Sequence, residues 1–254
     1  MKILLDLVTA DRGSVFLQGQ KPSSPLSRKG VRYLPENITF PPWATPLTLF
    51  RQLERIRREC SRRQFLDRCS ELQCRDLVKR PVGKMSRGQR QRVALSLITC
   101  GEPVMVFLDE PSSGLDPGGR ILVRNLIGDL GDQGCTVLIN SHLLGEVERV
   151  CHRAAFINRG RLVASGDLDS LSRQKGAAFI ETSDPQTMQR MLSAAGYSSK
   201  TVQRGVQASL SAEGDFPGLV RQVLDSELQF SGVSRMRETL EDVFLRIMDD
   251  KDVS

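Results

Sequence analysis

The chain has 254 residues, of which 39% are hydrophobic and 26% charged, and its formal net charge is +6 at pH 7. This length accommodates one good-sized domain and a small one, and the composition excludes a disordered or fibrous chain. No run of residues approaches the roughly 18 consecutive apolar residues that span a membrane. Asp6 and Asp11 interrupt the N-terminal segment, so no secretory leader is expected there.

The cysteines indicate the redox compartment of the protein, and the positive charge bears on its possible binding partners. The six cysteines form no CxxC pair and no metal-like grouping with the two histidines, which suggests a reducing compartment. The positive charge is concentrated between Arg51 and Arg68. A solvated helix face explains this cluster more simply than binding to nucleic acid or anionic lipid headgroups.

The first 72 residues predict short elements followed by two helices. We expect residues 1–8 to be the end of a helix, residues 14–17 a strand, and residues 31–35 another short strand after a loop rich in Pro and Ser. Between residues 47 and 72, apolar residues recur at a spacing of 3.6, which predicts two amphipathic helices with arginines outside. The apolar positions are Leu49, Leu53, Ile56, Cys60, Phe65, Cys69 and Leu72.

The middle of the chain alternates helices with apolar strands. Helices are expected at residues 87–99 and 117–130, and strands at residues 104–108 and 136–139. Buried strands separated by helices predict a parallel α/β sheet. A hairpin around Asn158 to Gly160 closes this first domain, residues 1–166, which includes a helical subdomain at about residues 44–100.

After residue 166 the pattern changes. Strands are expected at residues 177–181, around 201–210 and at 228–233, with helices at residues 185–194 and 216–226. This β-α-β-β-α-β order predicts a small α+β, ferredoxin-like domain over residues 167–254. Leu240, Val243, Phe244 and Ile247 mark a final amphipathic helix.

One candidate site begins the helix at residue 87. Ser86 followed by Gln89 is the pattern of a capping box, in which both side chains satisfy free backbone groups. The same helix start, with Gly88 and the cationic Arg87 beside it, also suits a phosphate group, because the amides and the helix dipole point outward. Both interpretations stay open on these residues alone.

Further candidates follow the two apolar strands. Asp109 and Glu110 end a strand, where ligands bind in open α/β sheets; an Asp there can hold Mg²⁺ and a Glu can activate a water. His142 follows the next strand. Each has a structural alternative: strands often end in acids, a lone histidine is often structural, and Asp116 can simply cap the helix that begins at Pro117.

Together these elements resemble the ATP-binding cassette (ABC) ATPase family. Residues 86–89 resemble its signature motif LSGGQ, with Arg87 in place of the first glycine, and residues 104–109 resemble the Walker B strand. The resemblance implies that Glu110 is the hydrolytic glutamate, His142 the switch histidine and residues 113–116, ending in Asp116, the D-loop. Glu36 stands where the Q-loop glutamine is expected, so the resemblance implies Mg²⁺ contacts for Asp109 and Glu36.

The resemblance also implies a fold, cofactors and partners. The fold would be a P-loop NTPase-like α/β domain, incomplete at its N-terminal side, with ATP and Mg²⁺ as cofactors. Residues 240–245 resemble the tail of ATPase subunits that serve exporters. Such a subunit would pair with a second ABC ATPase subunit, dock on a separate membrane permease from the cytoplasmic face, and bind no nucleic acid.

The phosphate loop GxxxxGK[ST] has no match in the chain, since Met85 follows the only Gly-Lys pair. Met1 would then lie inside the helix that follows such a loop. Three explanations stay open: a start assigned too late, a true truncation, or a subunit that lends its signature motif to an intact partner.

The function expected from the resemblance is ATP hydrolysis that drives an exporter. Alternatives are a non-hydrolysing cassette subunit and a cassette protein acting on ribosomes or DNA.

Overall fold

The computed structural model describes residues 1–57, 59–172, 174–210 and 216–252. The chain divides into two compact units, Met1–Val150 and Cys151–Ser254. Within the described ranges, no helix combines the length and apolar character needed to cross a membrane. The domain boundary expected after residue 166 stays a prediction.

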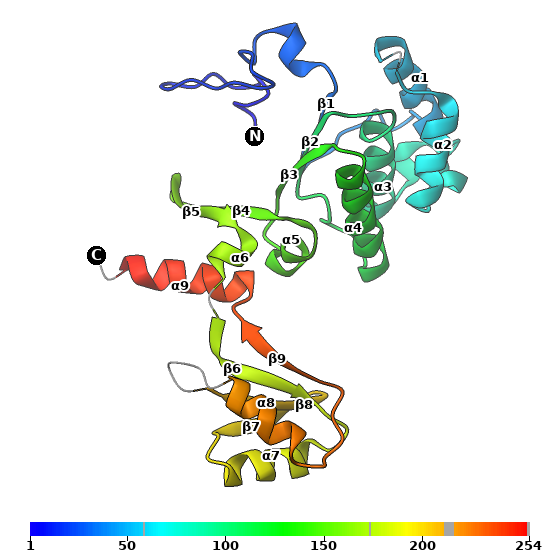
Figure 1. The fold of residues 1–254 in the computed structure, drawn as a ribbon. Helices are drawn as coiled ribbons and strands as arrows, with labels where there is room; N and C mark the ends of the chain where they lie inside the picture. Colours follow the sequence, from blue (N-terminus) through cyan, green and yellow to red (C-terminus); the bar gives the residue numbers. More distant parts are fainter. Residues whose placement is uncertain (58, 173, 211–215, 253–254) are drawn as a thin grey trace. The chain divides into compact units, whose positions relative to one another are not determined.

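The first unit is built on a three-stranded parallel sheet. Its strands are β1 (Val31–Leu34), β2 (Met105–Asp109) and β3 (Thr136–Asn140), in the order β1-β2-β3 (Figure 1). The sheet confirms the α/β architecture expected from the alternation of strands and helices. In β2, three consecutive residues from Val106 to Leu108 are buried, because a central parallel strand has both faces covered. At the edge of the sheet, β3 alternates exposed and half-buried residues.

In the described part of the first unit, five α-helices accompany this sheet. They are α1 (Pro46–Ile56), α2 (Arg62–Glu71), α3 (Arg87–Ile98), α4 (Pro117–Asp132) and α5 (Leu144–Val150), and three 3-10 turns lie at Pro25–Arg28, Arg75–Leu77 and Val82–Lys84. The two helices expected between residues 47 and 72 are confirmed, and Phe50 of α1 stacks on Phe65 of α2 with ring centroids 4.6 Å apart. Ile56, expected in the buried stripe, is 80% exposed at the last position of α1.

The N-terminal segment differs from the prediction. Residues 2–6 form turns and not a helix, and Asp6 has a left-handed φ of 58°. A short helical segment without tertiary support is marginal, because nucleation is costly. Residues 14–17 form no strand either; Leu17 makes a single bridge to Gln20. Leu5 and Leu17 are nevertheless buried against Phe107 of β2, so the segment still covers one face of the sheet.

The interpretation of the cysteines as single thiols is wrong for two of them, because the structure pairs them in a disulfide. Cys60, between α1 and α2, forms a disulfide with Cys100, just beyond α3, and the two Cα atoms are 5.8 Å apart. Glu59, next to Cys60, also forms an ion pair of 2.9 Å with the buried Arg32 of β1. The connection between α1 and α2 is thus fastened to the sheet and to the end of α3.

The second unit contains a hairpin and a four-stranded sheet. The hairpin, β4 (Arg153–Asn158) and β5 (Arg161–Asp167), is confirmed; its turn residues Arg159 and Gly160 both have positive φ, as a type I′ turn requires. The sheet has the antiparallel order β7-β8-β6-β9. The remaining elements are α6 (Leu168–Leu171), β6 (Gln174–Glu181), α7 (Pro185–Ala194), β7 (Ser199–Val202), β8 (Gly205–Ser209), α8 (Phe216–Leu224), β9 (Gly232–Arg237) and α9 (Leu240–Asp252).

The predicted β-α-β-β-α-β order is therefore present, with the last strand later than expected. Residues 228–231 approach β6 without joining it as a strand: the backbone N–H of Ser231 donates to Glu181 O at 2.8 Å and the Thr182 hydroxyl donates to Gln229 O at 2.7 Å. Regular pairing begins only at Gly232.

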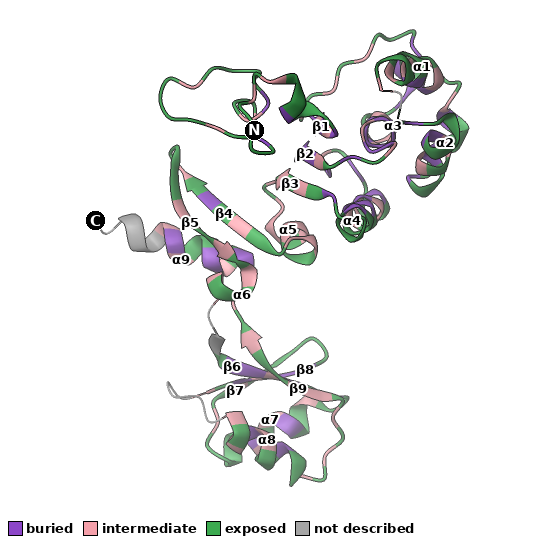
Figure 2. Cartoon of the chain, turned by 45° about the horizontal axis from the view of Figure 1, so that its top comes forward, coloured by how far each residue is buried: buried purple, intermediate pink, exposed green. Residues whose placement is uncertain are grey.

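The core of the four-stranded sheet lies between the sheet and its helices, and Figure 2 shows buried residues along β6. Ile180 and Val206 are paired across β6 and β8, and they pack with Met188 of α7 and Leu219 of α8. One position in this sheet is restricted to glycine. A Cβ atom at Gly205 would collide with the carbonyl oxygen of Ile180.

We expect Gly205→Ala to destabilise the second unit. The strand β8 must move away from β6 to admit the methyl group, and such overpacking costs about 1–3 kcal/mol or more. The measurement is urea unfolding of the chain followed by circular dichroism. Gly232→Ala in β9 is the matched control, because nothing lies within 4 Å of its added Cβ atom. Equal unfolding midpoints for the two variants would contradict the expected steric conflict.

Candidate functional site

The carboxyl ends of the three parallel strands place the predicted acidic residues and the histidine at one edge of the sheet. Leu34 of β1 is in register with Leu108 of β2, and Asp109 is in register with Asn140 of β3. Asp109 and Glu110 thus leave β2 beside the end of β3, where His142 follows. Open α/β sheets bind ligands at this edge, in the crevice outside the strand ends.

Glu110 and His142 form the centre of the candidate site. The Nδ1 atom of His142 lies 2.9 Å from Oε2 of Glu110, and the backbone N–H of His142 donates to Oε1 of the same carboxylate at 3.1 Å. The Glu110 side chain is 15% exposed and that of His142 is 72% exposed. A single residue therefore holds both carboxylate oxygens of Glu110, and the imidazole remains open to solvent.

The backbone of Glu110 is unusual. Its φ of 51° lies in the left-handed region, which non-glycine residues seldom adopt. The conformation is held on one side by a hydrogen bond from the Glu110 N–H to Asn140 O, at 2.8 Å. On the other side, Nε2 of the buried Gln91 of α3 donates to Pro111 O at 2.9 Å. Such over-determined strain is typical of functional sites, and here it lies at the predicted catalytic residue.

Asp109 has two neighbours whose role the sequence analysis missed: Asn140 orients its carboxylate, and Tyr33 lies within range of its charge. Nδ2 of Asn140 donates to Oδ1 of Asp109 at 2.8 Å. The pKa of the Tyr33 phenol, on β1, is raised. Burial is the larger cause, and the negative charge of the nearby Asp109 is the second. Asn140 was detectable from the strand register, because it is the residue paired with Asp109 across the parallel sheet.

The described residues contain no group of three or more His, Cys, Asp or Glu side chains that could hold a metal ion. Glu36 is exposed in the loop after β1, whereas the carboxylate of Asp109 accepts a hydrogen bond from Asn140. The proposed Mg²⁺ contacts of Asp109 and Glu36 therefore do not form a metal site made of protein ligands alone. A single carboxylate at Asp109 does fit the usual arrangement for Mg²⁺, in which phosphate and water oxygens supply the other ligands.

The capping box at the start of α3 is confirmed. The Ser86 hydroxyl accepts from the Gln89 N–H at 3.2 Å, and the Gln89 side-chain oxygen accepts from the Ser86 N–H at 3.0 Å. This arrangement fixes the helix start and leaves the binding of a phosphate there as a prediction. Gly88 lies close to the next loop, since an added Cβ atom would come 3.1 Å from Gly114 O.

Arg87 and Asp116 both have definite local partners. The guanidinium of Arg87 donates to the Ser113 hydroxyl at 2.8 Å, so its side chain lies over the loop after Glu110. Asp116 is the N-cap of α4, where its Oδ1 accepts from the Gly119 N–H at 2.8 Å. The structure thus brings the predicted signature residues and the predicted D-loop together within one subunit.

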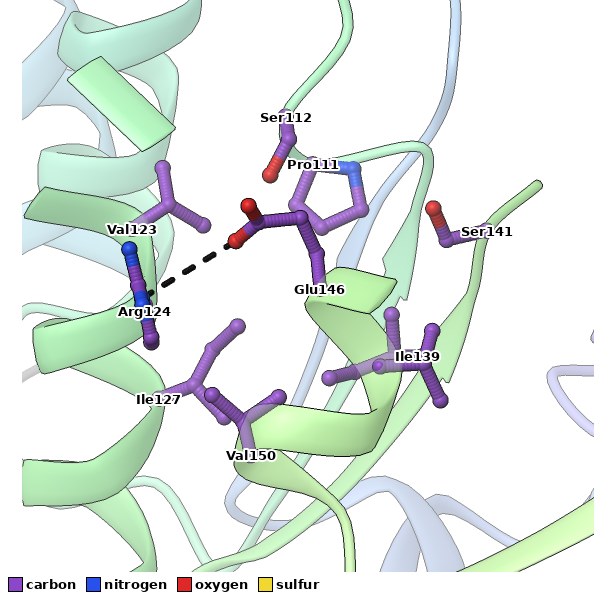
Figure 3. A pocket seen from close by; sticks show the side chains of 10 residues that line it. Pro111, Ser112, Val123, Arg124, Ile127, Ile139, Ser141, Glu146 and Val150 are labelled. Carbon is purple, nitrogen blue, oxygen red and sulfur yellow. Dashed lines mark ion pairs between the residues drawn. The ribbon is translucent and has the colours of Figure 1, made fainter. Parts of the chain in front are cut away.

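A separate pocket lies behind this site, between α4 and α5 (Figure 3). Its walls are mainly apolar, and Arg124 faces Glu146 across it with the charged atoms 3.9 Å apart. Pro111 and Ser112 reach its edge, but neither Glu110 nor His142 lines it. The pocket is therefore packing space between two helices and not the crevice that holds the candidate residues.

Comparisons with known proteins agree with this arrangement. A family model described as ABC transporter matches residues 1–113. An ABC transporter ATP-binding protein of Synechocystis is 31% identical over 270 residues, covering 100% of this chain and 72% of the relative. A lantibiotic transport ATP-binding protein of Streptococcus pyogenes is 30% identical over 171 residues, covering 66% of this chain and 73% of the relative. A daunorubicin resistance ATP-binding protein of Streptomyces coeruleorubidus is 28% identical over 210 residues, covering 80% of this chain and 66% of the relative.

A solved structure, described as the ATP-binding subunit of an ABC transporter, has a similar fold. Its TM-score is 0.61 at 23% sequence identity, and the alignment covers 67% of this chain and 73% of that chain. At this identity the likeness shows the fold, which agrees with the parallel sheet and helices described above.

We expect Asp109→Asn to lower the pKa of Tyr33 only in part. Removing the carboxylate charge removes one cause of the raised pKa, but burial, the larger cause, remains. The pKa should therefore fall towards the usual value of about 10 without reaching it. The measurement is a spectroscopic pH titration in a Tyr197→Phe background, since the chain has two tyrosines.

The same shift has a consequence for stability. Because the folded-state pKa of Tyr33 is raised, the neutral phenol stabilises the fold below about pH 10, and this contribution is lost as the pH rises through the raised pKa.

If the Tyr33 phenol titrates at the same pH in Asp109→Asn as in the unchanged chain, the carboxylate of Asp109 does not act on it.

Proposed function

Because this chain belongs to the family of ABC transporter ATP-binding proteins, we propose that it is the ATP-binding and ATP-hydrolysing subunit of an exporter, driving a separate membrane permease. The observation that carries the proposal is the carboxylate of Glu110, held by His142 directly after Asp109 at the sheet edge. A fixed carboxylate beside a magnesium-type aspartate is what water activation next to a phosphate requires.

In this proposal each residue at the sheet edge has a role. Glu110 accepts a proton from the attacking water, and His142 keeps that carboxylate in place. Asp109, oriented by Asn140, holds Mg²⁺, which when bound neutralises charge on the β- and γ-phosphates. Glu36 extends from the loop after β1, and we propose that it approaches the metal only when nucleotide is present.

The start of α3 acts on a nucleotide held mainly by a second ABC ATPase subunit. The outward-facing amides of a helix N-terminus favour an anion, and Ser86 and Gln89 hold that terminus in a defined conformation. We propose that Ser86, Arg87, Gly88 and Gln89, with Asp116 on the neighbouring loop, face the partner subunit in a homo- or heterodimer.

The two helices between residues 47 and 72, within the helical segment of residues 44–100, are the proposed contact with the permease, at the cytoplasmic face of the membrane. Trp43 before α1 is 70% exposed and Ile56 at its end is 80% exposed, so apolar side chains are available on this surface. The arginines of α1 and α2 then serve as a solvated rim, and nucleic acid is not the proposed partner.

The exporter direction rests on the relatives and on the C-terminal helix. Two relatives are named for lantibiotic transport and for daunorubicin resistance. The helix α9 begins with the run Leu240 to Leu245, capped by Thr239 and Asp242, and resembles the tail of exporter subunits. The cargo would be recognised by the permease and not by this subunit.

The phosphate loop is proposed to lie outside residues 1–254, because no GxxxxGK[ST] motif occurs within them. A longer reading frame or the partner subunit would supply it. If the loop is absent from the mature subunit, the second candidate function applies: a non-hydrolysing cassette that completes the site of an intact ATPase.

We expect residues 1–254 alone to show no binding of Mg-ATP in the micromolar range. The amides and lysine that cradle the β- and γ-phosphates are missing, and Asp109 alone is a poor magnesium site. The measurement is calorimetric titration of this chain beside a version extended upstream to include a phosphate loop. Micromolar affinity of the short chain would contradict this account of the site.

Glu110→Gln should abolish most turnover in a form of the protein that includes the phosphate loop. Removing a general base costs roughly 10²–10⁴-fold in rate, and the affinity for ATP should be retained because Gln preserves shape. Glu102→Gln, at an exposed acid outside the cluster, is the control. Turnover of Glu110→Gln within a factor of about two of the control would exclude the assigned role.

A further inference from the structure

We infer that Arg87 is a positioning residue that fastens the start of α3 to the loop of residues 110–116, so that the two segments facing the second subunit move as one body. The consequence for catalysis rests on the proposed function. The contact itself lies entirely within the first compact unit.

The hydrogen bond from Arg87 to Ser113 is supported by close packing along the arginine stem. A Cβ atom at Gly114 would lie 2.8 Å from Cδ of Arg87 and 3.0 Å from its Cγ. Gly114 also has a φ of 72°, so both its backbone and its lack of a side chain suit this approach. The stem of Arg87 therefore covers the glycine while its guanidinium reaches the serine.

Two further residues of the same helix extend this contact. An added Cβ at Gly88 would come 3.1 Å from Gly114 O, and Gln91, one turn after Arg87, donates to Pro111 O. Residues 87 and 91 share a helix face because they are four apart. The first turns of α3 thus lie along residues 111–114 of this loop, directly after Glu110, the residue that His142 holds.

This geometry distinguishes two roles for Arg87. As a phosphate ligand, its guanidinium would direct the N–H groups that Ser113 does not use towards the nucleotide. As a positioning residue, it keeps Ser113 in place and transmits any movement of the signature segment to Glu110. The hydrogen bond to Ser113 and the close packing of the Arg87 side chain against Gly114 favour the positioning role.

Amide hydrogen exchange of the chain of residues 1–254 tests the contact without nucleotide. The reporters are the N–H groups of Ser113 and Leu115, which donate to Glu110 O and Ser112 O within the loop. In Arg87→Ala their exchange should be roughly three- to tenfold faster, the factor expected for one lost hydrogen bond. Ser113→Ala should accelerate Leu115 similarly, and the double variant should add little.

Arg92→Ala is the matched control, because Arg92 lies on the same helix but donates to Gln73 O. It should leave the exchange of Ser113 and Leu115 unchanged. Equal exchange in Arg87→Ala and Arg92→Ala would overturn the inference, and so would wild-type exchange of Leu115 in Ser113→Ala.

A second readout uses a form of the protein that includes the phosphate loop. Positioning predicts that Arg87→Ala lowers kcat and leaves the Kd for Mg-ATP unchanged, whereas loss of a phosphate ligand would raise that Kd and overturn the inference. If no variant hydrolyses ATP at all, the proposed function fails, and the exchange experiment still decides whether Arg87 holds the loop.

Discussion

The parallel register of three strands is the constraint on which the rest of the first unit depends. Because β1, β2 and β3 run in the same direction, their carboxyl ends share one edge. Leu34 and Leu108, which are 74 positions apart in the chain, become neighbours there, and so do Asp109 and Asn140, which are 31 positions apart. The buried centre of β2 anchors this edge. Asp109 and Glu110 acquire their geometry from that strand, and His142 acquires its place from β3.

A second layer of contacts joins this edge to α3. The buried amide of Gln91 holds the backbone after Glu110, and Arg87 holds the loop a few residues further on. The unusual φ of Glu110 is therefore supported from two elements, β3 and α3, and not by the loop alone. Support from several directions is what allows a strained residue to persist in a folded protein.

Much of the fold and part of the site were predictable from the sequence, and the failures have physical causes. Sequence patterns identified the three parallel strands and most helices, and the Ser86–Gln89 spacing identified the capping box, because those signals are local. The predictions of a helix end at residues 1–8 and of a buried Ile56 were wrong. Helix formation and burial at these positions depend on whether another element packs against them. Asn140 and Gln91 escaped notice because a polar residue becomes significant only once the register shows what lies opposite it. The phosphate role of Arg87 stays a prediction, and its hydrogen bond to Ser113 could be seen only once the position of the loop was known.

The position of β3 at the edge of the sheet has a consequence for how such a subunit is completed. In the described part of the chain no strand lies beyond β3, and Leu138 is 40% exposed on it. Any strand that joins β3 in parallel must point the same way as β2, so it must end beside Glu110 and His142. The direction of the existing strands therefore determines where the next residues lie. The segment that follows an added parallel strand begins near the candidate site, whatever the rest of the fold is.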